Sequence, residues 1–134
     1  MFIGHHRVDG EPVPLYKVLA METLCQARLG RLFKGGFTAT CEGWYEGDGG
    51  DFLSEPCSII VSLTPAVNER AWAQLNALAG DVAMQLHQEC VLVAKFDLGG
   101  NSEMRFVPPA QATIERDKTS QWIEVSVREE KHAA

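Results

Sequence analysis

The sequence lacks any apolar run near the roughly 18 to 20 residues that a membrane-spanning helix needs. It also lacks a secretory signal, because no charged segment followed by an apolar one opens the chain. These absences predict a cytoplasmic protein without membrane attachment. The 134 residues are 46% hydrophobic and 22% charged, and this balance is typical of one folded domain.

Basic residues are also scarce, since 12 Lys and Arg stand against 18 Asp and Glu, a net charge of −6. Proteins that bind nucleic acids neutralise phosphates with Lys and Arg, so the composition disfavours such a partner. A small basic group, Arg28, Arg31 and Lys34, keeps nucleic-acid binding as a third hypothesis. The stacked-aromatic motif of sheet-binding RNA modules is absent.

Motifs for metals, cofactors and nucleophilic catalysis are missing. The four cysteines form no CxxC pair, and the adjacent His5 and His6 would point to opposite faces of a strand. No G-x-S-x-G elbow occurs, and the acidic segment 46–51 does not match a calcium loop. We therefore expect no metal and no cofactor. The cysteines are interpreted as buried thiols, with Cys41 and Cys57 facing one another across a hairpin.

Two segments have helical periodicity. Apolar residues recur every three or four positions from Leu15 to Phe33, and Glu22 falls within this stripe. A second stripe, which includes Trp72, predicts a helix over 69–88 with Asn68 as its N-cap. Both patterns predict helices with one apolar face.

The remaining segments alternate with a period of two or are continuously apolar, as strands do. The predicted strands are 1–8, 37–45, 57–63, 90–96 and 104–107, with a last hairpin over 111–116 and 121–128. This order resembles the ferredoxin-like, split βαβ architecture. We expect a single α+β domain over 1–134, with a βαββαβ core over 1–97 and two helices on one face. Two or three extra strands over 98–128 and a tail over 129–134 would follow.

A candidate binding surface follows if Phe37, Cys41, Ile59 and Val61 face the helices. The opposite, open face of the sheet would then present polar side chains, namely His6, Thr40, Glu42, Trp44, Ser58, Ser62 and Lys95. Hydroxyls, a carboxylate and a histidine beside a tryptophan suit a small polar ligand. Alternatively, a second copy or the C-terminal strands cover this face.

The first functional hypothesis is therefore a non-catalytic binding or assembly protein, with a protein or small-molecule partner, that forms a homodimer. A small sheet has unpaired edges and one open face, which proteins cover with extra strands or with another chain. The alternative is a small enzyme using His5 or His6 with Glu42, Trp44 and Lys95 on the open face. Glu42 and Lys95 would lie at opposite edges of the sheet, which disfavours this alternative.

Overall fold

Two helices and five strands make up the described part of the chain, residues 1–47 and 49–110 of this computed structural model. The helices are α1 (Leu15–Phe33) and α2 (Glu69–Gln85). The strands are β1 (Phe2–Gly4), β2 (Gly36–Glu46), β3 (Phe52–Ser62), β4 (Val91–Phe96) and β5 (Ser102–Val107). The hairpin and the tail expected beyond residue 110 lie outside the described residues.

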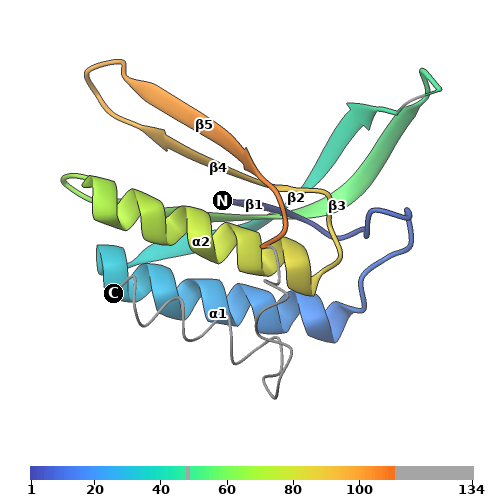
Figure 1. Cartoon of the computed structure of the whole chain (residues 1–134), viewed down its shortest axis with the longest axis horizontal. Coiled ribbons are helices and arrows are strands. Elements are labelled where there is room, and N and C mark those ends of the chain that lie inside the picture. Colours follow the sequence, from blue (N-terminus) through green and yellow to red (C-terminus); the bar gives the residue numbers. More distant parts are fainter. Residues whose placement is uncertain (48, 111–134) are drawn as a thin grey trace, which may run out of the picture.

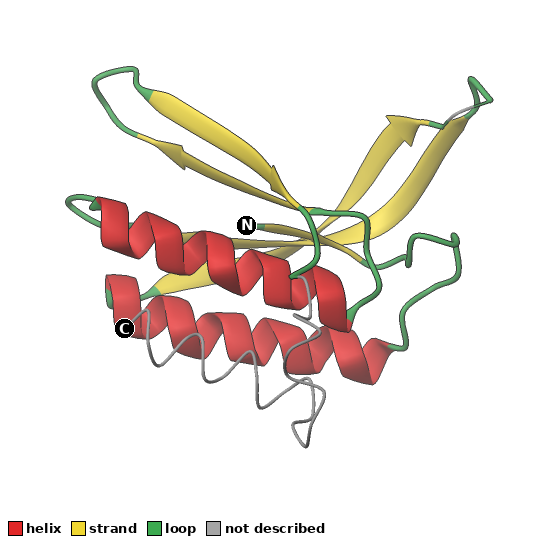
Figure 2. Cartoon of the chain, viewed as in Figure 1, coloured by secondary structure: helices red, strands yellow, loops and turns green. Residues whose placement is uncertain are grey.

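The helices begin and end close to the predicted positions. In α2, the Asn68 side chain accepts a hydrogen bond from Ala71 N at 2.8 Å, which confirms the predicted N-cap. Lys34 adopts a left-handed conformation (φ 72°) and ends α1. Both helices lie on the same side of the sheet (Figure 2), and their buried apolar stripes pack against it.

The sheet is antiparallel throughout, with the order β2-β3-β1-β4-β5. Its centre is the three-residue strand β1, whose Ile3 is fully buried. The buried Gln88 amide donates to Gly4 O and His6 O, and so ties β1 to the end of α2. On either side of β1 the β2–β3 and β4–β5 hairpins bend away from the helices and diverge (Figure 1).

Two strand boundaries differ from the sequence-based prediction. The expected loop over 46–55 is much shorter, because β3 already begins at Phe52 and pairs with Glu46. The rings of Trp44 and Phe52 lie 6.3 Å apart, and such a contact stabilises the end of the hairpin, so that only the residues between Glu46 and Phe52 remain of the expected loop. The first strand is shorter than predicted, and His6 makes only an isolated bridge with Pro12.

The predicted facing of the central hairpin is wrong. Ser58 and Ile60 are buried against the helices, and Thr38 accepts a hydrogen bond from Gln26 of α1 at 2.9 Å. Successive residues of a strand point to opposite faces, so the residues expected to face the helices point away from them, namely Phe37, Cys41, Ile59 and Val61. The more apolar set of the hairpin thus lies on the open face and the serines of β3 lie on the helix-facing side, so hydrophobicity indicated the wrong face.

At the start of β2, the backbone of Gly36 packs closely against β3. A Cβ at Gly36 would lie 1.9 Å from the carbonyl oxygen of Val61, whereas a Cβ at neighbouring Gly35 would meet nothing within 4 Å. We expect Gly36→Ala to lower the free energy of unfolding by about 2 kcal/mol or more, because the backbone must move apart. Gly35→Ala is the matched control and should change it by less than about 1 kcal/mol. Urea unfolding of both variants measures the difference, and equal effects would contradict the tight approach.

Candidate functional site

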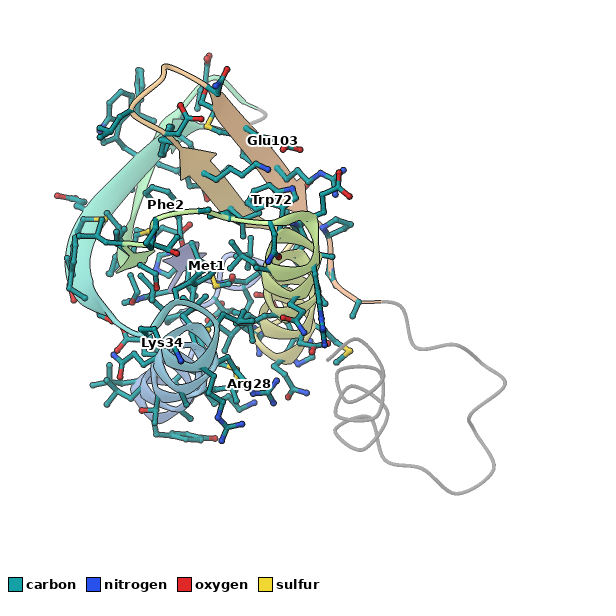
Figure 3. All side chains as sticks on the ribbon, turned by 90° about the vertical axis from the view of Figure 1, so that its left-hand side faces the viewer. Met1, Phe2, Arg28, Lys34, Trp72 and Glu103 are labelled. Atoms are coloured by element: carbon teal, nitrogen blue, oxygen red, sulfur yellow. The ribbon has the colours of Figure 1, made fainter. Side chains whose placement is uncertain are left out.

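The seven residues predicted to share a binding face are not brought together. Lys95 points toward the helices, with its Nζ 4.8 Å from the centre of the Trp72 ring and 3.2 Å from Glu103 Oε2. Figure 3 shows Trp72 and Glu103 on the α2 side of the molecule. The expected position of Lys95 on the open face is therefore wrong, and the cation–π contact with Trp72 explains its placement.

The polar residues of β2 and β3 also lie on the helix-facing side. Thr40 pairs with Ser58 and Glu42 pairs with Pro56, so all four side chains share the face on which Ser58 is buried. Trp44 follows by alternation and is 74% exposed, because the hairpin extends beyond the helices there. The open face therefore lacks the hydroxyls and the carboxylate that the ligand hypothesis placed on it.

Ser62 and His6 lie apart from these residues. Ser62 lines a cleft of about 330 Å³ at the C-terminal end of α1, together with Gln26 and Thr38. The amide of Gln26 and the hydroxyl of Thr38 already bond one another, so neither group requires a ligand there. The backbone N–H of His6 donates to Glu55 Oε2 at 2.8 Å, and its Nδ1 lies 3.8 Å from the same oxygen.

A hydrogen-bonded chain that the sequence did not predict links β1, β3 and α1. The Ser58 hydroxyl donates to Glu22 Oε1, and Nε2 of His5 lies 2.7 Å from Ser58 Oγ. Because Ser58 donates to the carboxylate, the imidazole must donate to Ser58. The Ser58 residue is 0% exposed, so this hydroxyl meets no substrate, and the chain satisfies buried polar groups. A signal existed in the sequence, since Glu22 stands in the apolar stripe of a helix.

The hydrogen-bonded chain of His5, Ser58 and Glu22 makes the free energy of unfolding depend on pH. Burial lowers the pKa of His5, although the nearby carboxylates of Glu22 and Glu55 oppose the shift and His6 reinforces it. The unfolded chain therefore binds a proton more readily, and stability falls as pH drops below about 6.5 toward the lowered pKa. We expect His5→Gln to reduce the loss of stability between pH 7 and pH 5.

Urea unfolding at both pH values measures this loss. His87→Gln is the matched control. It removes a histidine that does not belong to the hydrogen-bonded chain of His5, Ser58 and Glu22, so the pH dependence should stay close to that of the wild type. An unchanged pH dependence in His5→Gln would contradict the role of His5.

The open face is a continuous apolar surface. Cross-strand pairing places one residue from each strand in a single row, in the order Ala39, Ile59, Phe2, Leu92 and Phe106. Paired residues share a face of the sheet, so the row crosses all five strands on the side away from the helices. Nothing in the described chain covers it, and Phe106 is 69% exposed.

The neighbouring rows extend this apolar surface. Alternation along the strands places further exposed side chains on the same face, namely Phe37, Tyr45, Leu53, Phe96 and Met104. Among the described strand positions on this side, Glu55 carries the sole charge. We call this surface the open apolar face.

Two cysteines lie on the open apolar face, which corrects the expectation that they face the core. Cys41 and Cys57 are directly opposite one another, as predicted, and both are half-buried free thiols. Burial raises the pKa of Cys57 to about 12, and the neighbouring Cys41 adds to the shift. Within residues 1–47 and 49–110, no three His, Cys, Asp or Glu side chains are grouped to hold a metal ion.

Comparisons with protein-family models, curated proteins and solved structures give no match to this chain. Among the described residues, neither helix combines the length and the apolar character needed to cross a membrane.

Proposed function

We propose that the protein is a non-catalytic assembly module that forms a homodimer through its open apolar face. The observation that carries this proposal is the uncharged row from Ala39 to Phe106, which crosses every strand of the sheet. Exposed apolar surface of this extent marks an interaction site, because leaving it in water is costly.

The area of the face supports a second copy as the occupant. Six large side chains on it are between 44% and 72% exposed: Phe37, Tyr45, Leu53, Phe96, Met104 and Phe106. Together they offer roughly 700 Å² of surface, given about 200 Å² for a large side chain. A stable interface of standard size buries about 800 Å² on each partner. Two copies of this face would therefore meet the usual requirement.

The charge distribution also favours self-association on this side. The chain carries a net charge of −6, so copies repel one another except where a surface is uncharged. Arg28 and Lys34 lie around α1, remote from the open face (Figure 3). The open apolar face is thus the region where two copies approach with the least electrostatic cost.

For the fold, we propose the ferredoxin-like arrangement with one added edge strand. The order β2-β3-β1-β4 and the α1 and α2 connections support it, and β5 extends the sheet beside β4. A cytoplasmic location is part of the same proposal. It agrees with the four free thiols, because reducing compartments keep cysteines unpaired.

The polar-ligand and enzyme hypotheses lose their geometric basis on this face. Apart from His6, which contacts Glu55, the residues assigned to them lie on the helix-facing side or against α2. A protein surface is therefore the better partner for the open face.

The dimer is tested by placing a charge in the row. We expect Phe106→Lys to weaken self-association by about 3 kcal/mol, roughly a hundredfold, because an unpaired ammonium would be buried in the interface. Tyr16→Lys is the matched control, since Tyr16 is 70% exposed and lies on α1. Sedimentation velocity over a concentration series gives the dissociation constant of each protein.

The control should dimerise like the wild type, and circular dichroism should show the same fold for all three proteins. A wild type that remains monomeric at high concentration would refute the proposal. Equal weakening by the two substitutions would show that the interface lies elsewhere.

A further inference from the structure

The open apolar face contains a pair of directly opposed thiols within reach of one another. Cys41 on β2 and Cys57 on β3 occupy directly opposed positions in the hairpin. Each is half-buried, so small reagents reach the pair, and each carries a free thiol. Cys25 of α1, in contrast, is fully buried in the core, where its thiol lies 3.7 Å from Met1 Sδ.

The hydrogen-bond pattern of the sheet fixes the spacing of this pair. Pro56 and Ile60 direct their backbone groups toward the first strand, through His5 N to Pro56 O and Ile60 N to Met1 O. Backbone groups alternate along a strand, so those of Cys57 point to Cys41. Opposed residues of this hydrogen-bonded kind have Cα atoms about 5.5 Å apart, which is within the range of disulfides. Their Cβ atoms are about 5 Å apart, wider than the roughly 3.8 Å of a relaxed disulfide, so the two strands must shift and the bond formed is strained and easily reduced.

We propose that Cys41 and Cys57 form a reversible oxidation site that reacts with low-molecular-weight disulfides such as glutathione disulfide. The Cys41 thiolate attacks one glutathione sulfur, the glutathione S–S bond breaks, and one glutathione thiolate leaves. Cys57 then loses its proton to solvent and attacks the Cys41 sulfur, expelling the second glutathione thiolate. Two protein thiols are oxidised to one disulfide, and one glutathione disulfide is reduced to two thiols.

The surroundings of the two sulfurs explain why Cys41 reacts first and Cys57 second. Burial and the charge of the neighbouring Cys41 raise the pKa of Cys57 to about 12, so Cys57 is a poor first nucleophile. Once Cys41 is capped by glutathione, its negative charge no longer opposes ionisation of Cys57. The second step is then intramolecular and benefits from proximity. In a reducing compartment such a bond is transient and acts as a sensor.

The experiment treats the folded chain with glutathione disulfide at pH 8, caps the remaining thiols with iodoacetamide and maps the peptides by mass spectrometry. We expect a Cys41–Cys57 disulfide, seen as linked peptides whose mass is lower by two hydrogen atoms than that of the two free-thiol peptides. Dithiothreitol should reverse it. Cys90→Ser, the matched control, should keep the link. Cys41→Ser and Cys57→Ser should abolish it.

The same treatment of Phe106→Lys separates this proposal from the dimer, because a second copy on the open apolar face would shield the pair. A link in Phe106→Lys, or in the wild type, supports the oxidation site whether or not the protein dimerises. If both proteins leave Cys41 and Cys57 free for alkylation, or carry only mixed disulfides with glutathione, the proposal is overturned.

Discussion

The short central strand β1 determines the arrangement of the whole sheet. It contributes three residues, yet it pairs with β3 on one side and with β4 on the other. Ile3 is fully buried toward the helices, so Phe2 must point to the opposite face. Every cross-strand partner of Phe2 then lies on the open face, and this is why the apolar row extends from one edge of the sheet to the other.

This constraint explains which parts of the fold the sequence predicted. The helices and β4 follow from local periodicity, which does not depend on what the sheet packs against. The facing of β2 and β3 depends on a tertiary choice, because Ile59 and Ile60 are both apolar and point in opposite directions. The helices cover Ile60, and no local pattern in the hairpin encodes that choice.

The candidate site was less predictable for a related reason. Polar residues at alternating positions suggested a solvent-facing ligand surface, but Ser58 is polar because it bonds Glu22 and His5 in the interior. Glu22 in an apolar helical stripe was the one local sign of this chain. Lys95 faces α2 because the Trp72 ring accepts its ammonium, a contact between residues far apart in the sequence. The opposition of Cys41 and Cys57, in contrast, followed directly from alternation within the hairpin.

A sheet with apolar side chains on both faces has little protection against misalignment of its strands. Sliding β2 by one residue along β3 would turn Phe37, Ala39 and Cys41 toward the helices and the polar set that includes Thr38 toward the open face, so hydrophobic burial does not by itself favour the observed alignment. The discrimination falls to small and polar groups. Gly36 fits against the Val61 carbonyl only in the observed alignment, and Thr38 reaches Gln26 of α1 only when its side chain points to the helices. These residues therefore specify the register in which the strands pair, while the apolar residues supply most of the stability.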